Sequence, residues 1–127
     1  MHGGAQVIGA ALDAALSSAN RVPDLLLSGH VHAYQRFTRP MIGGKTLTYI
    51  VIGNCGYHNL HLLAQDAQRG RQLPGGVAFE FGDDQNWGYL ELTVQGNTIS
   101  GAYNAVTATG QVTPKADTFT AGGWRRC

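Results

Sequence analysis

Charged residues are scarce in this chain. Only 13% of its 127 residues are Asp, Glu, Lys or Arg, and together they give a net charge of +1. A balance this close to neutral provides no general attraction to nucleic acid or to an anionic membrane. We therefore expect neither among the partners of the chain, and any affinity for a phosphate group must be local.

Cysteine and long apolar runs are also lacking. The two cysteines, Cys55 and Cys127, fit neither a disulfide framework nor a cysteine-rich zinc motif, so we expect free thiols. No stretch approaches the roughly 18 to 20 continuous apolar residues of a membrane span. The first six residues carry no basic cluster of the kind that opens a signal peptide. These absences predict a soluble chain without a signal peptide and leave its compartment unknown.

Glycine, by contrast, is abundant. The chain has 18 glycines, an apolar fraction of 43% and a mean hydropathy of −0.12. Its length suits one modest domain with a single core. Many glycines and few charges favour a loop-rich fold dominated by sheet.

The first third of the chain predicts a helix followed by strands. Apolar residues recur at helical spacing over residues 7–19, and an uninterrupted apolar run at residues 25–28 predicts a strand buried on both faces. Residues 37–40 should be extended, with a tight turn at Gly43-Gly44 and a second strand at 47–52. The last two extended segments are expected to form a hairpin.

The remaining two thirds alternate apolar and polar residues between turns. The loop at residues 53–58 ends a strand and is expected to return toward the candidate metal site at residues 30–32, described below. A short helix is predicted at residues 60–68, and Gln95-Gly96-Asn97 reads as a hairpin turn. Strands are predicted at residues 77–81, 87–94, 98–104 and 111–112. The fold class indicated is mixed α/β, of the α+β kind, and rich in sheet.

The most informative segment follows the first predicted strand directly. It reads Gly29-His30-Val31-His32-Ala33-Tyr34-Gln35-Arg36. Residues i and i+2 of an extended or turn segment project to the same side, so His30 and His32 can hold one metal ion, or one ion each of a metal pair. Gly29 leaves no Cβ where the backbone turns. The pattern predicts a metal site at the carboxyl end of a strand.

This segment resembles the last metal-ligand motif of the calcineurin-like metallophosphoesterases. The similarity is greatest to the Gly-His-Val-His-Ala-Tyr-Glu-Arg stretch of the purple acid phosphatase group, with Gln35 here in place of Glu. The Tyr-Ile-Val-Ile-Gly strand at residues 49–53 and the phrase Asp117-Thr118-Phe119-Thr120 are similar to later parts of that group. The resemblance covers nearly the whole chain but only the C-terminal part of the family domain.

The resemblance implies a fold and a division of the chain. The fold would be the C-terminal portion of a four-layer αββα sandwich, and residues 1–127 would form a single, partial domain. Within it, residues 1–36 would supply the helix, strand and histidine loop, and residues 37–127 the mainly β remainder.

The resemblance also implies a function, the hydrolysis of phosphate esters by a two-metal centre. His30 would ligate one metal and His32 the other, with iron, zinc or manganese as the metals. The other ligands of such enzymes are mostly acidic and come from motifs upstream, and neither Asp13 nor Asp24 matches one. The chain alone is therefore predicted to be weakly active or inactive, and to need a missing N-terminal portion or to form a homo-oligomer.

Three further residues, two of them within the motif, are candidates for contact with substrate. His2 occupies about the place where relatives of the purple acid phosphatases carry a histidine that approaches the substrate phosphate, so we consider it a catalytic candidate. Tyr34 and Arg36 could bind substrate, because an arginine can hold phosphate with two hydrogen bonds. Arg36 could equally have a structural role, which we favour.

Two histidines downstream are candidates for an accessory role. His58 and His61 would share one face if helical, and could support or extend the metal site; a polar loop without metal is the competing interpretation. The rival to the phosphoesterase hypothesis is a non-catalytic module that binds metal or a partner chain. The substrate, the metals and the oligomeric state are not determined by the sequence.

Overall fold

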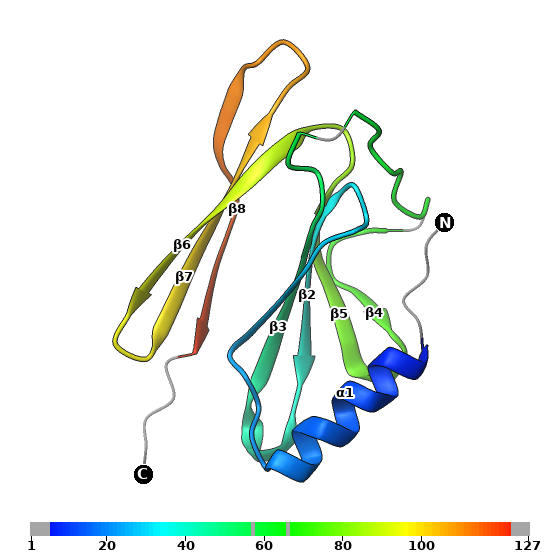
Figure 1. The fold of residues 1–127 in the computed structure, drawn as a ribbon, viewed down its shortest axis with the longest axis vertical. Helices are drawn as coiled ribbons and strands as arrows, with labels where there is room; N and C mark the ends of the chain where they lie inside the picture. Colours follow the sequence, from blue (N-terminus) through cyan, green and yellow to red (C-terminus); the bar gives the residue numbers. More distant parts are fainter. Residues whose placement is uncertain (1–5, 57, 66, 123–127) are drawn as a thin grey trace.

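The computed structural model describes residues 6–56, 58–65 and 67–122, and within them it is sheet-rich with one helix and eight strands (Figure 1). The mixed α+β class predicted from the sequence is confirmed. The elements in chain order are α1 Gln6–Ala19, β1 Leu25–Ser28, β2 Tyr34–Pro40, η1 Ile42–Gly44, β3 Thr46–Ile52, β4 Arg71–Leu73, η2 Pro74–Gly76, β5 Val77–Asp83, β6 Trp87–Gln95, β7 Thr98–Val106 and β8 Val112–Gly122.

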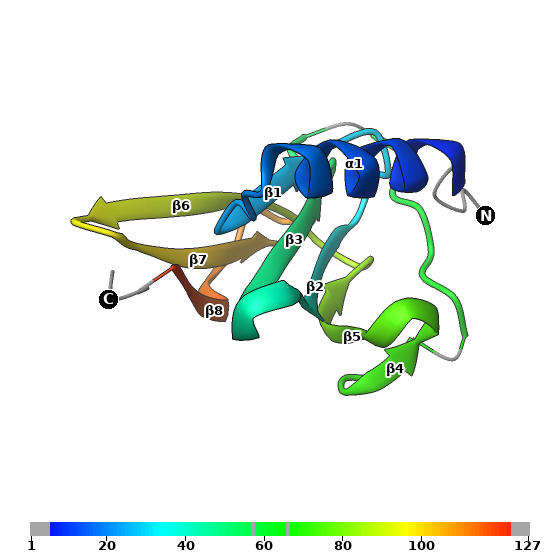
Figure 2. The same cartoon turned by 90° about the horizontal axis from the view of Figure 1, so that it is seen from below.

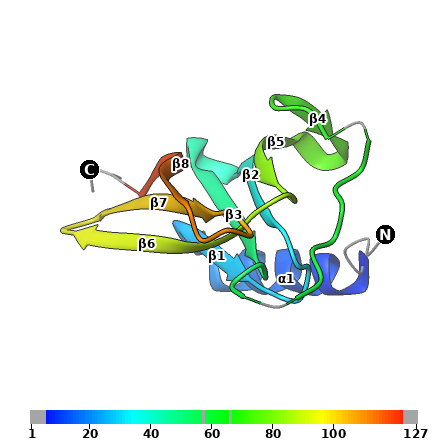
Figure 3. The same cartoon turned by 90° about the horizontal axis from the view of Figure 1, so that it is seen from above.

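The strands form two sheets. The first has the order β1-β3-β2-β5-β4 and the second the order β6-β7-β8. In the first sheet β1 runs parallel to β3, and β2 pairs antiparallel with both β3 and β5. The predicted β2–β3 hairpin and the turn between β6 and β7 are both confirmed, the latter by pairing of Gln95 with Thr98. Figures 1 and 3 show β4 and β6 on opposite sides of the molecule.

Side chains of β2 show how the layers are stacked. Arg39 reaches Asp13 of α1, so this face of the first sheet lies under the helix (Figure 2). Tyr34 and Arg36 project to the opposite face, because successive strand residues alternate. There they bond to Asp117 of β8, in the second sheet. The first sheet is therefore the middle layer between the helix and the second sheet.

Two sequence predictions about these elements are wrong. β1 is not buried on both faces, since Leu27 is 52% exposed and Ser28 is exposed. The reason is its position: β1 is an edge strand, and β3 is the only described strand that pairs with it. The helix expected at residues 60–68 is also absent from the described part of that segment. Residues 59–65 instead form an irregular segment over the sheet, which we call the strap.

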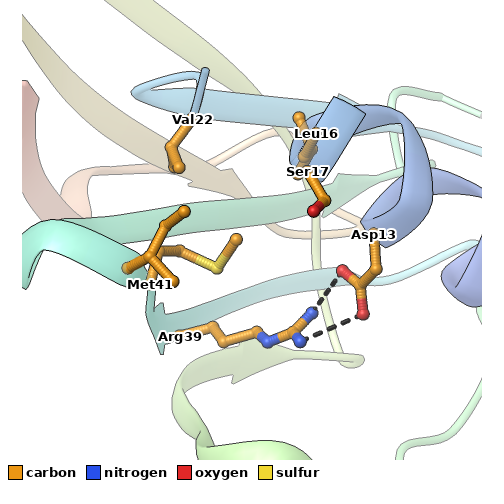
Figure 4. A pocket seen from close by; sticks show the side chains of 7 residues that line it. Asp13, Leu16, Ser17, Val22, Arg39 and Met41 are labelled. Carbon is orange, nitrogen blue, oxygen red and sulfur yellow. Dashed lines mark hydrogen bonds and ion pairs between the residues drawn. The ribbon is translucent and has the colours of Figure 1, made fainter. Parts of the chain in front are cut away.

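The helix α1 makes few contacts with the sheet. Its central contact is the ion pair from Arg39 to Asp13, at 2.7 and 3.0 Å, which also lowers the pKa of the Asp13 carboxyl through its hydrogen bonds to Arg39. A cavity of about 190 Å³ lies beside this pair, lined also by Leu16 and Met41 (Figure 4). Much of the apolar surface of the helix is nevertheless exposed, including Val7 at 81%.

A buried ion pair joins the two sheets. Asp117 accepts hydrogen bonds from Arg36 Nε and a second guanidinium nitrogen at 2.7 and 2.8 Å, and from the Tyr34 hydroxyl at 2.9 Å. The exposed fractions of Arg36 and Asp117 are 8% and 7%. The guanidinium also lies 5.8 Å from the ring centroid of Phe119. Asp117 thus satisfies three buried donor groups on two side chains of β2 and fixes the second sheet against the first.

Stacked tyrosines continue this contact between the sheets. The rings of Tyr34 and Tyr103 lie 4.0 Å apart at an angle of 4°, and both residues are fully buried. Asn54 donates to the Tyr103 hydroxyl at 2.7 Å and to the backbone oxygen of Asn86 at 2.9 Å. The Tyr103 hydroxyl lies 3.3 Å from Asp83. The loop after β3 is therefore tied to the second sheet.

These tyrosines predict how stability depends on alkaline pH. Burial, reinforced by Asp117 for Tyr34 and by Asp83 for Tyr103, raises the pKa of both hydroxyls well above their ordinary value. Because the folded state holds these protons while unfolded tyrosine loses them above about pH 10, each should lower the free energy of unfolding by about 1.4 kcal/mol per pH unit above that value.

Urea unfolding at a series of pH values from neutral into the alkaline range measures this slope. Tyr34→Phe should remove about half of it, whereas Tyr89→Phe, at a site that is 46% exposed, should leave it unchanged. Equal slopes in the wild-type chain and in Tyr34→Phe would contradict the assignment.

No helix in the described residues is long and apolar enough to cross a membrane.

Candidate metal site

The two histidines of the motif lie in the loop at residues 29–33, between the carboxyl end of β1 and the start of β2. The parallel neighbour β3 ends at the same edge, and Gly53 after it donates a backbone hydrogen bond to Ala33 at 3.3 Å. The predicted position of the motif at a strand end is confirmed, and the loop after β3 contacts the histidine loop at Gly53. The metal site toward which that loop was expected to return stays a prediction. Convergence of the two imidazoles stays a prediction.

Each histidine is the central residue of a three-residue turn. The Val31 N–H donates to the Gly29 carbonyl at 3.0 Å, around His30, and the Ala33 N–H donates to the Val31 carbonyl at 2.8 Å, around His32. His30 has a φ of 74°, which makes its turn the rarer and strained form of γ-turn. Strain of this kind persists where surrounding structure enforces it, and it concentrates at functional sites.

The glycine that this loop requires is Gly53, and the role assigned to Gly29 from the sequence is corrected. A Cβ on Gly29 would meet only the Ile52 carbonyl oxygen, at an ordinary 3.6 Å. A Cβ on Gly53 would collide with the backbone carbonyl of Val31 and come within 3.3 Å of the His30 nitrogen. The loop can therefore pack on the end of β3 only because residue 53 has no side chain.

This contact gives a direct test of what supports the loop. Gly53→Ala should push residues 29–33 away from β3 and lower the free energy of unfolding by about 1 to 3 kcal/mol, the usual cost of overpacking. Gly29→Ala is the matched control and should be neutral or slightly stabilising, because it restricts the unfolded chain without a clash. Thermal unfolding and the backbone NMR shifts of the loop measure both effects. Equal behaviour of the two variants would contradict the geometry.

His32 is held in place by two residues of the strap, Asn59 and His61. The His32 N–H donates to His61 Nδ1 at 3.2 Å, and the His61 N–H donates to the His32 carbonyl at 2.9 Å. The two imidazoles are stacked, with centroids 4.3 Å apart and an interplanar angle of 19°. His32 Nδ1 lies 2.6 Å from the carbonyl oxygen of Asn59. A carbonyl can only accept, so Nδ1 carries the proton and Nε2 the lone pair of neutral His32.

That arrangement is the one a metal ligand needs. Histidines that bind metals usually donate their other ring N–H to a carbonyl or carboxylate, which fixes the tautomer and the orientation of the ring. His61 is used differently, because its Nδ1 accepts from the backbone of His32. In this conformation it is a support for His32, and the accessory-ligand role suggested for it has no geometric basis.

The set of ligands is incomplete within the described residues. No group of three or more His, Cys, Asp or Glu side chains that could hold a metal ion is found there. Asp13 and Asp117, two carboxylates in the described residues, are engaged by arginines. Within the described residues, His30 and His32 are therefore candidate ligands that are not part of a group of three.

The other residues singled out in the sequence fall in three places. Tyr34 and Arg36 are buried on Asp117, which favours the structural role and argues against substrate contact, since neither side chain reaches the surface at the loop. His58 is exposed in the loop three residues before His61. Cys55 is an exposed free thiol, as predicted. His2 lies outside the described residues.

A groove opens beside the histidine loop. Its volume is about 1050 Å³, and it lies between the strap and the helix-facing side of the first sheet. Phe37 and Phe79, packed edge to face at 5.3 Å, line it, with Gln35 and Arg71 as polar members. His61 also lines the groove, which places this space next to the contacts that hold His32.

Sequence reasoning missed two parts of this site. Asn59 acts through its backbone carbonyl, for which no side-chain pattern exists. The contact of His61 with residue 32 was missed because a helix was expected at residues 60–68, whereas this segment is irregular where the structure describes it. A glycine directly after a strand, such as Gly53, was the available signal for a close approach of two backbones.

The chain matches no protein-family model, no curated protein and no solved structure.

Proposed function

We propose that this chain is the C-terminal, histidine-bearing part of a metal-dependent phosphoesterase similar to the purple acid phosphatases. His30 and His32 would each ligate one ion of a metal pair of iron, zinc or manganese. The two sheets and α1 would belong to the four-layer αββα sandwich of the calcineurin-like metallophosphoesterases, with the remaining helix layer and the carboxylate ligands supplied by another segment.

One observation carries this proposal. His32 donates from Nδ1 to the Asn59 carbonyl, and its Nε2 therefore has the lone pair that a metal requires. The location of the histidine loop also supports the proposal. The loop lies at the carboxyl ends of the parallel strands β1 and β3, and open α/β sheets bind ligands at this edge. The strained turn at His30 is a further mark of a functional loop.

The chemistry divides between the metals and the chain. A bound metal pair would polarise the phosphate and lower the pKa of a bound water. The chain itself holds His32 in one tautomer and holds the backbone of both histidines in tight turns. The groove beside His61 is lined by Phe37, Phe79 and Arg71, and it offers room for the organic part of a phosphate ester.

Metal binding to the isolated chain tests the proposal. Zinc binding, measured by competition with a chromophoric chelator, should weaken at least tenfold in His32→Ala and in His30→Asn. Asparagine is chosen at position 30 because it tolerates the positive φ of that residue. His58→Ala is the control and should bind as the wild type does. Zinc binding that is absent from the wild-type chain, or equal in all four proteins, would exclude the two histidines as metal ligands.

A second candidate function, a module that binds a partner chain, has an observation of its own. β1 is a Leu-Leu-Leu-Ser strand at a sheet edge, and Leu27 is half exposed. Edge strands normally carry charges, proline or a bulge that prevent further pairing, and residues 25–28 have none. Val7 and Ile8 of α1 add exposed apolar surface. Such an edge accepts an additional strand, and a strand parallel to β1 would end beside His30.

Light scattering after size-exclusion chromatography tests this second candidate. Association should depend on concentration and should be reduced by Leu27→Lys, which places a charge on the open edge. The matched control is Leu92→Lys, which places the same charge at an exposed site of the second sheet. A clean monomer at all concentrations, with a cooperative thermal transition, would contradict an edge that needs a partner.

A further inference from the structure

Asn59 and His61, both in the strap, make several contacts with His32. Two hydrogen bonds join residues 32 and 61: the His61 N–H donates to the His32 carbonyl, and the His32 N–H donates to the His61 ring at Nδ1. The two rings are also stacked, with centroids 4.3 Å apart. Asn59 places its carbonyl 2.6 Å from His32 Nδ1. All these contacts act on one side chain and the backbone that carries it.

We propose that His61 and Asn59 are positioning residues, which together hold His32 in the Nδ1-protonated tautomer and present its Nε2 as a ligand atom. The value of this arrangement for metal binding rests on the function proposed above, but the tautomer itself does not. His61 acts through His32 and is not itself a ligand in this role.

The hydrogen bonds fix the protonation of both rings. His61 Nδ1 accepts the His32 N–H, so this nitrogen cannot carry a proton and neutral His61 is protonated on Nε2. His32 has the opposite tautomer, because the Asn59 carbonyl accepts from its Nδ1. Loss of the acceptor at position 61 would leave the bond from the His61 N–H to the His32 carbonyl in place but remove the second hydrogen bond between the two residues. The segment would then be held less firmly, and we expect the Asn59 carbonyl to move away from His32 Nδ1. His32 would then return to the Nε2-protonated form that a solvated imidazole prefers.

Four variants separate the contributions of the ring and of the acceptor. His61→Ala removes both, His61→Phe keeps an aromatic ring without an acceptor, and His61→Asn restores an acceptor without the imidazole. His58→Ala, in the same loop and exposed, is the matched control. Long-range ¹H–¹⁵N spectra of the metal-free chain, recorded well above the ordinary imidazole pKa of about 6.5, assign the tautomer of His32 directly.

The wild-type chain, His58→Ala and His61→Asn should show His32 protonated on Nδ1. His61→Ala and His61→Phe should move His32 toward the Nε2-protonated form and weaken zinc binding by roughly 10- to 100-fold, the usual effect of losing a group that orients a ligand. A purely structural role for His61 would lower the melting temperature without changing the tautomer.

An Nε2-protonated His32 in the wild-type chain would overturn the inference, as would an Nδ1-protonated His32 in His61→Phe. If the tautomers follow the expectation but the wild-type chain binds no zinc, the positioning by His61 stands and the proposed metal function fails. The two ideas are thereby tested separately.

Discussion

Asp117→Ala is expected to lower the free energy of unfolding by about 3 to 5 kcal/mol, the range found when one partner of a buried ion pair is removed. The reason is that the Arg36 guanidinium loses its counter-charge while it stays buried, and the Tyr34 hydroxyl loses its acceptor. This loss approaches the whole stability of a small domain, about 5 to 15 kcal/mol. Urea unfolding followed by far-ultraviolet circular dichroism measures it.

The chain offers a matched control for this substitution. Asp13 is also held by an arginine through two hydrogen bonds, but its side chain is 43% exposed. Solvent screens such a pair, so Asp13→Ala should cost no more than about 1 kcal/mol. The double variant Arg36→Met with Asp117→Leu should recover much of the loss, because it removes both buried charges together. Equal costs for Asp117→Ala and Asp13→Ala would show that burial of the first pair has no energetic consequence.

The second large effect concerns catalysis by the chain alone. With no group of three metal ligands in its described residues, we expect turnover of an aryl phosphate far below the usual enzyme range of about 1 to 10³ per second, whichever of zinc, manganese or iron is added. A two-metal site acts as a unit, and loss of one component removes most of the rate. Activity should return only when a segment that supplies carboxylates is joined or added.

Phosphatase assays over a range of added metal measure this rate. The control is His32→Ala, which should abolish whatever residual metal-dependent activity the wild-type chain has, while His58→Ala should leave it unchanged. Turnover within the enzyme range by the 127-residue chain, dependent on His32 and on metal, would mean that the chain contains a complete site.

Local patterns were sufficient to predict most of the elements. The helical spacing of residues 7–19 and the Gln95-Gly96-Asn97 turn were read correctly, since helices and tight turns are determined by neighbours in the sequence. The histidine loop was also placed correctly, because a strand followed by glycine and two histidines leaves few other arrangements. The apolar run of β1 predicted burial, and here the pattern was wrong, because burial depends on which strands lie beside it.

Thus the sequence by itself determined the helix, most of the strands, the main turns and the position of His30 and His32 at a strand end. It did not predict β4, nor most of β8, which extends over Val112–Gly122 where strand was expected only at residues 111–112. The tertiary structure alone decided what these residues touch. Asp117 meets Arg36 across 81 residues of sequence and His61 meets His32 across 29, and no local pattern encodes such pairs. The contacts that hold His32 include the Asn59 backbone carbonyl, and the packing of its loop on the end of β3 depends on the missing side chain of Gly53. Both are properties of how two segments pack, and neither leaves a signature in residue type at the motif itself.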